Sequence, residues 1–341
     1  MKEFVEKYNL SKTPRRSLIG SMHGEKMLFA TPLLKWYLDK GLKITRVYEC
    51  IEYQPVRCFR SFVQKVCDAR RLGDTDPDKS IIADTMKLIG NSAYGSMIMD
   101  KTKHTEFILT DNHEKAMNHV NNPLYRKIKE LSENAFEIEL AKTKIIIDLP
   151  IVLGYFILQL AKKHMLAFYY DFVDKYIPRN CFEYCQKDTD SAYMALSGPN
   201  LESCVPNHLK AEFLKEKHNW FPRDDTPEHA AYDKRVCGLF KLEYEGTRMV
   251  SLCAKSYCVH NDKRDHSKFS CKGVSKKQFD KPTDIYKQVL DTGISYTGKN
   301  VGFRKNKHVL HTYEQEKIAF SYFYGKRKVL SDGISTAPLD I

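Results

Sequence analysis

Long apolar runs are missing from this 341-residue sequence. No run of about 18 or more apolar residues occurs, so a membrane span is not expected. The first residues, MKEFVEK, lack the apolar core of a secretory signal, so we expect an intracellular, non-secreted chain. The sequence also has no internal repeat and no low-complexity tract. These absences favour an ordinary globular protein.

Closely paired cysteines are missing as well. The sequence has 10 cysteines but no Cys-x2-Cys pair, and the closest spacing, Cys181-x3-Cys185, lies inside a predicted strand. This spacing argues against a zinc site, and a chain of this size does not need a disulfide framework. We therefore expect reduced thiols that are mostly buried.

Basic residues, in contrast, are in excess. The chain has 55 Lys and Arg against 43 Asp and Glu, a net charge of +12. This excess favours a polyanionic partner, either a nucleic acid or an anionic membrane surface. Twenty tyrosines and 18 phenylalanines offer rings that could stack on bases, although most aromatic residues in any protein are core.

The order of predicted elements favours the α+β class, because strands and helices interleave without a regular βαβ rhythm. The length allows two or three domains with a substantial core. Helices are predicted at Thr31 to Lys40 (closed by Gly41), from Asp76-Pro77 to Tyr94 with a stop at Gly95, over 113–138, and at Tyr155 to Ile177. Strands are predicted at Ile44 to Tyr53, 144–153, in a hairpin over 181–196, at Val236 to Tyr244 and at Met249 to Val259. A connection rich in Pro, His and Asp spans 198–232, and helix-like segments alternate with basic clusters after about Ser275.

The tetrapeptide Asp188-Thr189-Asp190-Ser191 lies at the tip of the predicted hairpin. Two carboxylates one residue apart in a tight turn can both reach a hard divalent cation. Mg²⁺ prefers one or two carboxylates together with substrate phosphates. Such a site suits phosphoryl or nucleotidyl transfer. The alternative is a surface hairpin made of ordinary turn residues.

A second group of polar residues lies in the predicted helix that ends near Gly95, within the sequence KLIGNSAYG. Lys87, Asn91 and Tyr94 are spaced i, i+4 and i+7, so they share one face. A lysine on this face can neutralise a triphosphate, and a tyrosine can contact a sugar and base. Gly95 permits another backbone or a nucleic acid to approach the helix closely. The alternative is an amphipathic helix with a solvated lysine and a capping glycine.

Two further groups could contact a nucleic-acid backbone. Lys255 and Tyr257 are expected to face the same side of one strand, where charge and a hydroxyl or ring could hold phosphates. The basic clusters Phe303 to His308 and Lys326 to Lys328 are interleaved with aromatic residues. The alternatives are an exposed sheet edge and a solvated charged face.

These groups, taken in order, resemble the motifs of family B DNA polymerases. Lys87 to Gly95 resembles motif B, Lys-x3-Asn-Ser-x-Tyr-Gly, and Asp188 to Ser191 resembles motif C, Asp-Thr-Asp-Ser. Lys255 to Tyr257 resembles the Lys-x-Tyr motif. The order and separations are similar to those of the protein-primed branch, which includes viral, organellar, linear-plasmid and Polinton/Maverick polymerases. Weaker similarity covers nearly the whole chain, including Thr31 to Thr45 and Phe303 to Thr312.

The resemblance implies a right-hand polymerase architecture, with an antiparallel palm sheet flanked by helices, helical fingers and a small thumb. It implies a partial palm or connecting region at 1–60, fingers at 61–99, palm at 100–260 and thumb at 261–341. The implied partners are primer–template DNA, deoxynucleoside triphosphates and a terminal protein that primes synthesis. The implied cofactors are two Mg²⁺ ions, with Mn²⁺ as an alternative.

The resemblance also implies a role for each matched residue. Asp188 and Asp190 are the expected catalytic carboxylates and metal ligands. The expected nucleotide-binding residues are Lys87, Asn91, Tyr94 and Gly95. The expected DNA-binding residues are Ser191, Lys255, Tyr257, Arg304 and Lys305, the last two chosen from charge more than from motif.

Parts of the family pattern have no match. Motif A, Asp-x2-Ser-Leu-Tyr-Pro, supplies the second metal-binding aspartate upstream of motif B and is not found, and neither is any Asp-x-Glu of an exonuclease. Gln186 and Lys187 stand where family members usually carry Tyr and a small residue. The sequence thus indicates the C-terminal portion of a larger polymerase, without the motif A strand and the N-terminal exonuclease.

Two functions follow from these observations. The first is template-directed deoxynucleotidyl transfer to a primer end by a two-metal mechanism, in the replication of a virus, plasmid or transposon. The second is a catalytically inactive DNA-binding remnant of such a polymerase. A reverse transcriptase is disfavoured, because those enzymes usually carry two adjacent aspartates in the corresponding turn.

Overall fold

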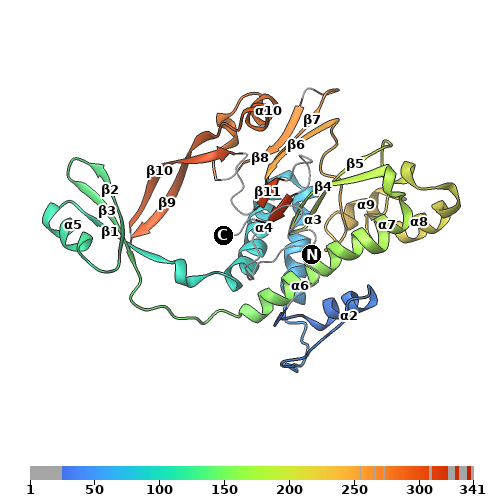
Figure 1. Cartoon of the computed structure of the whole chain (residues 1–341), viewed down its shortest axis with the longest axis horizontal. Helices are drawn as coiled ribbons and strands as arrows, with labels where there is room; N and C mark the ends of the chain where they lie inside the picture. The colour runs from blue at the N-terminus through green and yellow to red at the C-terminus, as the bar shows by residue number, and fades with distance from the viewer. Residues whose placement is uncertain are drawn as a thin grey trace. The chain divides into compact units, whose positions relative to one another are not determined.

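The computed structural model describes residues 25–253, 255–264, 266–271, 273–306, 309–321, 327–329 and 336–338. Helices accompany several small antiparallel sheets, which confirms the α+β class (Figure 1). The chain forms two compact units. The first unit takes in the described parts of Met1–Val56, Gln159–Asn300 and Glu316–Ile341, and the second takes in Arg57–Leu158 and Val301–Gln315.

A long helix supplies much of the core of the first unit. It begins as α6 (Ile151–Ala167), continues as a π-helical segment (Phe168–Val173) and ends as α7 (Asp174–Tyr176). This confirms the helix predicted at Tyr155 to Ile177, although it starts earlier, at Ile151. In its C-terminal part, Met165, Phe168 and Phe172 recur every three or four positions and are buried, whereas many apolar residues of its N-terminal part are exposed. The buried core residues are Phe168, Phe172, Val173, Tyr176, Ile177, Phe182, Cys204, Val205 and Phe213.

A β-hairpin packs against this helix. It consists of β4 (Phe182–Asp188) and β5 (Ser191–Leu196), as predicted. Ala192, Met194 and Leu196 of β5 contact the helical core. The hairpin is therefore fixed by its apolar residues, and its polar tip is left at the end of the two strands.

Shorter helices surround the same core. They are α2 (Thr31–Asp39), α8 (Lys210–Lys217) and α9 (Pro227–Asp233). The helix α2 confirms the prediction, and Gly41 follows it at a φ of 92°. Trp36 Nε1 of α2 donates a hydrogen bond to Asp171 Oδ2 at 2.8 Å, and Lys40 pairs with the same carboxylate. Asp171 thus anchors α2 to the long helix.

A three-stranded sheet forms a second core in the first unit. It has the order β6 (Arg248–Cys253), β7 (Ser256–Asn261) and β8 (His266–Ser270), and α10 (Pro282–Thr292) packs against it (Figure 1). Its core residues are Leu252, Cys258, Tyr286, Val289, Ala319 and Phe320. The single strand predicted at Met249 to Val259 is wrong, because the chain reverses between Cys253 and Ser256.

A helical hairpin opens the second unit. It consists of α3 (Arg60–Thr75) and α4 (Ser80–Met97), which lie side by side (Figure 1). Asp76 caps the connecting turn Pro77–Lys79, because its side chain accepts a hydrogen bond from the Asp78 N–H. The predicted stop at Gly95 is wrong, since α4 continues to Met97.

A small sheet with one helix completes the second unit. The strand order is β1 (Thr105–Thr110), β3 (Ala135–Ala141) and β2 (Tyr125–Ser132), and α5 (His113–Val120) contacts all three strands. The helix predicted over 113–138 is therefore wrong beyond Val120. Ile138 and Leu140 of β3 are buried together with Ala116 of α5 and form the core of this sheet.

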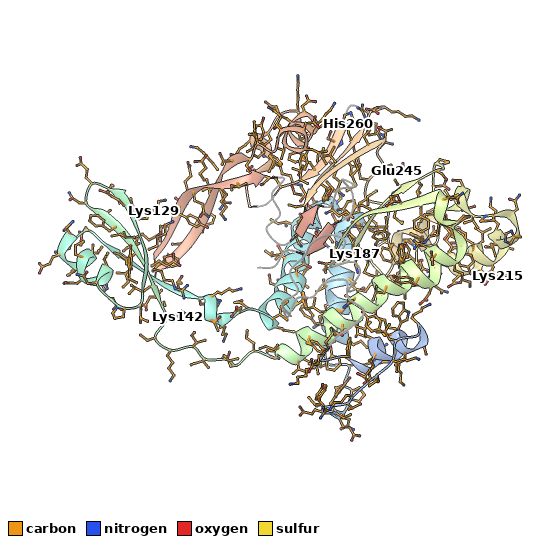
Figure 2. The ribbon with its side chains drawn as sticks, in the orientation of Figure 1. Lys129, Lys142, Lys187, Lys215, Glu245 and His260 are labelled. Carbon is orange, nitrogen blue, oxygen red and sulfur yellow. The ribbon has the colours of Figure 1, made fainter. Side chains whose placement is uncertain are left out.

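A long hairpin follows α10, where the sequence indicated helix-like segments. It consists of β9 (Tyr296–Asn306) and β10 (Val309–Phe320), and the short strands β11 (Arg327–Val329) and β12 (Thr336–Pro338) pair with each other. Within the second unit, Lys129 of β2 donates to Glu314 O at 2.9 Å (Figure 2). His311 Nε2 lies 3.2 Å from Glu137 Oε2.

Several strand predictions are wrong. Residues 44–53 and 236–244 have no regular secondary structure, and 144–153 is irregular up to Ile151, where α6 begins. A short apolar run such as 144–153 does not by itself distinguish a strand from a helical segment, and here its last residues begin a helix. Among the cysteines, Cys50, Cys58, Cys185 and Cys237 are exposed and only Cys204 and Cys258 are buried, so the expectation of mostly buried thiols is also wrong.

The helical stretch Ile151–Tyr176 also bears on the membrane question. It has 26 residues and a mean hydropathy of 1.3 in its most apolar part, which by length and composition alone is enough to cross a membrane. Core helices of globular domains meet the same criterion. The C-terminal part of this stretch buries Phe168 and Phe172 in the core of the first unit, whereas Val152 and Leu160 in its N-terminal part are exposed.

Candidate metal and nucleotide site

The hairpin tip places two carboxylates in a very tight turn. Asp188 ends β4 and pairs with Ser191, which begins β5, so Thr189 and Asp190 form the turn. The Asp190 N–H donates to Asp188 O at 2.6 Å, and Thr189 has a φ of 50°. This is the geometry of a γ-turn, which is strained for a β-branched residue. Strained backbone of this kind gathers at functional sites, which makes the turn a candidate site.

The register of the hairpin decides which side chains accompany the carboxylates. Directly paired residues share a face, so Asp188 and Ser191 lie on the same face as Gln186 and Tyr193. The Asp188 side chain is half-buried and Asp190 is exposed. The hairpin therefore presents a partly shielded carboxylate beside an accessible one.

Lys187, which is labelled in Figure 2, lies on β4 directly before Asp188. Because neighbouring side chains of a strand point to opposite faces, Lys187 and Asp188 lie on opposite faces of the hairpin. Desolvation, together with the positive charge of Lys162, lowers the pKa of Lys187. The alternation of the strand directs it away from Asp188.

A different lysine neutralises Asp188. Lys255 Nζ lies 2.9 Å from Asp188 Oδ1. Lys255 occupies the turn between β6 and β7 at a φ of 66°, because Cys253 pairs with Ser256 on either side of that turn. The prediction that Lys255 lies in a strand on the same side as Tyr257 is therefore wrong. The lysine reaches the carboxylate from a turn, whereas Tyr257 lies within β7.

Two more contacts join these hairpins. Ser251 Oγ donates to Gln186 Oε1 at 2.5 Å. The rings of Tyr193 and Tyr257 lie 4.6 Å apart between centroids. Burial, and next the hydrogen bond with Tyr257, raises the pKa of Tyr193. None of the sequence motifs includes Tyr193, although its alternation with Ser191 along β5 places both residues on the carboxylate face.

The residues expected to bind a nucleotide lie on α4 in the second unit. Their predicted spacing is confirmed, because Lys87, Asn91 and Tyr94 follow one face of a continuous helix. Lys87 and Asn91 are exposed, and Tyr94 is half-buried, where desolvation raises its pKa. A Cβ added at Gly95 would meet nothing within 4 Å. The face of α4 that carries these residues is therefore open at Gly95 to an approaching ligand.

The expected DNA-binding residues of the C-terminal region are only partly described. Arg304 and Lys305 lie in β9, but their side chains are outside the described residues, as are the residues 307–308 and 322–326 of the basic and aromatic clusters. Phe303, at the start of the first cluster, is 72% exposed.

Asp188 and Asp190 provide few carboxylate ligands, but enough to suit a hard cation. Within the described part of the chain, no group of three or more His, Cys, Asp and Glu side chains is placed to hold a metal ion. Asp188 and Asp190 supply carboxylate oxygens only, and Mg²⁺ commonly binds one or two carboxylates and completes its shell with water and substrate phosphates. The residues present therefore fit Mg²⁺ or Mn²⁺ bound together with a phosphate ligand.

Comparison with known proteins gives no family for the chain. No family model, no curated protein and no solved structure matches it.

Proposed function

We propose that this chain carries the fingers, the thumb and a palm without the motif A strand of a family B DNA polymerase of the protein-primed branch. The activity would be template-directed transfer of deoxynucleotides to a primer 3′ end, in the replication of a virus, plasmid or transposon. Its partners would be primer–template DNA, deoxynucleoside triphosphates and a terminal protein. The proposal involves no membrane. The proposal rests on the sequence motifs and on the contacts of the first unit.

One observation carries the proposal. Lys255 and Asp188 are 67 positions apart in numbering yet form an ion pair. Asp188 belongs to the segment that resembles motif C, and Lys255 belongs to a separate segment that resembles the Lys-x-Tyr motif. A chance resemblance between short motifs gives no reason for them to meet. Their contact, together with that of Tyr193 and Tyr257, favours a single site built from both motifs.

The residues would divide the work as follows. Asp188 and Asp190 would hold the metal ions, which when bound stabilise charge on the attacking and leaving oxygens. Lys87 would bind nucleotide phosphates as a point charge, assisted by the Asn91 amide, and Tyr94 would lie near the sugar and base. Because a Cβ at Gly95 would project into open space, the glycine would allow a ligand to approach α4 closely.

Other residues would hold the nucleic acid. Lys255, the hydroxyl of Ser191, and the basic side chains of Arg304 and Lys305 would contact phosphates, which fix register without reading sequence. Tyr257, expected to contact the nucleic acid directly, is buried against Tyr193 and would support the site from behind. The net charge of +12 supports such a role, since neutralising phosphates releases counterions.

A primer-extension assay tests the proposal. The full chain is incubated with a labelled primer–template, deoxynucleoside triphosphates and Mg²⁺, beside the variants Asp190→Asn and Asp262→Asn. Asp262 is a matched control, because it is an aspartate of the first unit that pairs with Arg248. We expect extension by the wild type and by Asp262→Asn, and none by Asp190→Asn. Extension that is equal in all three would contradict the proposed site.

The second candidate is an inactive DNA-binding remnant. It is favoured by the small donor set, since Asp188 and Asp190 have no third ligand among the described residues. A two-metal mechanism needs carboxylates that converge from more than one strand. This candidate predicts salt-dependent binding of primer–template with no extension, and detection of extension by the chain excludes it.

A further inference from the structure

We propose that Lys255 and a divalent cation compete for Asp188, so that metal binding releases Lys255 to a phosphate of the nucleic acid. The inference rests on the proposed function, because it takes Asp188 as part of the metal site. It adds a regulatory property to that site: an internal cation that holds one carboxylate until a metal ion takes its place.

The ion pair has one fixed partner and one movable partner. The Asp188 side chain is 27% exposed and ends a strand, whereas the Lys255 side chain is 61% exposed. A lysine side chain of four methylene groups can leave a carboxylate by rotating, at little cost when it is well solvated. Two cations at one carboxylate repel each other. Metal binding at Asp188 therefore favours conformations in which Lys255 has moved away.

The two hairpins do not depend on this ion pair to stay together. Ser251 bonds to Gln186, and Tyr193 packs on Tyr257. These contacts lie along the strands, behind the tip that carries Asp188. Release of Lys255 is thus a movement of one side chain. The ammonium group of Lys255 stays near the site, where it can pair with a phosphate.

The size of the effect follows from the exposure of the pair. Exposed ion pairs are weak, and their loss corresponds to about a two- to fivefold change in a competing equilibrium. Removal of the lysine charge is therefore expected to tighten divalent-cation binding by about two- to fivefold. Lys187 lies on the other face of the hairpin, so removal of its charge is expected to change divalent-cation binding less.

The test measures Mn²⁺ binding directly, by electron paramagnetic resonance of free Mn²⁺ during titration of the full chain without nucleotide. The variants are Lys255→Met and Lys255→Gln, with Lys187→Met as the matched control and Asp190→Asn to locate the binding site. Unchanged thermal unfolding shows that each variant is folded. We expect tighter Mn²⁺ binding in both Lys255 variants, little change in Lys187→Met and weaker binding in Asp190→Asn.

Addition of primer–template gives a second measurement. Because linkage is reciprocal, DNA that draws Lys255 to a phosphate is expected to tighten Mn²⁺ binding in the wild type more than in Lys255→Met. Equal Mn²⁺ affinity of wild type and Lys255→Met, with Asp190→Asn weakened, overturns the competition but leaves the metal site intact. Mn²⁺ binding that Asp190→Asn does not change overturns the proposed function as well.

Discussion

Tyr193 of β5 packs its ring against Tyr257 of β7, with centroids 4.6 Å apart and planes inclined by 53°. The contact joins the hairpin that carries Asp188 to the hairpin that carries Lys255. It lies between two motifs that were recognised separately, and neither motif contains Tyr193. The position of Lys255 beside the carboxylate thus depends on a residue outside both motifs.

The tyrosine pair predicts a loss of stability at alkaline pH. Burial raises the pKa of Tyr193, so the contribution of its phenol to stability is fully present below the ordinary tyrosine pKa of about 10 and is lost as pH rises above it. Tyr193→Phe removes the ionisable group but keeps the ring. The urea midpoint of the wild type should therefore fall more steeply above pH 10 than that of Tyr193→Phe. Parallel curves for the two proteins would show that the phenol is not protected in the folded state.

Two glycines of the helical hairpin predict opposite stability effects. A Cβ at Gly73 would lie 2.4 Å from Ala83 Cβ, so Gly73→Ala must separate α3 from α4 and should cost about 1–3 kcal/mol. A Cβ at Gly95 meets nothing within 4 Å, and alanine favours a helix, so Gly95→Ala should stabilise by about 0.5–1 kcal/mol. Urea unfolding followed by circular dichroism measures both changes.

Gly95→Ala also separates stability from function. If Gly95 serves the approach of a nucleotide, as proposed, its alanine variant should be more stable yet extend a primer more slowly. A variant that is both more stable and fully active would show that the glycine has no role in ligand binding.

Arg223 and Asp233 predict the response to acid. The Asp233 carboxylate, which is 7% exposed, accepts from Arg223 N, Nε and Nη2 at 3.0, 2.7 and 2.8 Å, and these bonds lower its pKa. The stabilisation is therefore present above the ordinary aspartate pKa of about 3.9 and is lost as pH falls below it. Asp233→Asn should cost about 1.5–3 kcal/mol at pH 7. The deficit should shrink only below about pH 4.

A neighbouring aspartate serves as the control for this prediction. Asp224 is 71% exposed and pairs with Lys217 at 3.1 Å, so Asp224→Asn should change stability by less than about 1 kcal/mol. Equal losses in the two variants at pH 7 would contradict the importance of burial at Asp233.

Lys255 predicts the salt dependence of nucleic-acid binding. If it contacts one phosphate in the presence of Mg²⁺, Lys255→Ala should weaken primer–template binding for every sequence and reduce the slope of log K against log salt by about 1. Lys175 is a matched control, because it pairs with Glu212 and Glu216 at 2.8 and 3.1 Å. Fluorescence anisotropy over a range of salt concentrations measures the slopes. The same slope for Lys255→Ala and wild type would exclude the phosphate contact.

Strong local signals predicted part of the fold correctly. The long helix at 155–177 was predicted by the periodic spacing of residues such as Met165 and Phe168, and the hairpin by turn residues between two apolar strands. The same turn residues led to the carboxylates of the candidate site. In each case residues close in sequence determine the local structure.

The wrong secondary-structure predictions concern turns that lack typical turn residues and segments whose structure depends on tertiary contacts. Lys255 adopts a positive φ that usually belongs to glycine or asparagine, so nothing in the sequence marked the reversal between β6 and β7. The charged segment after Val120 forms strands because Ile138 and Leu140 pack against α5, which a helical pattern does not reveal. The ion pair of Lys255 with Asp188 depends on that reversal and could not be predicted without it.

Templated incorporation of a single nucleotide tests the central claim most directly. The full chain is given four primer–templates that differ only in the templating base, with each deoxynucleoside triphosphate in turn and Mg²⁺. Our account predicts that each template directs addition of its complementary nucleotide by the wild type, and that Asp190→Asn adds none. Addition that ignores the templating base, or that persists in Asp190→Asn, would contradict it.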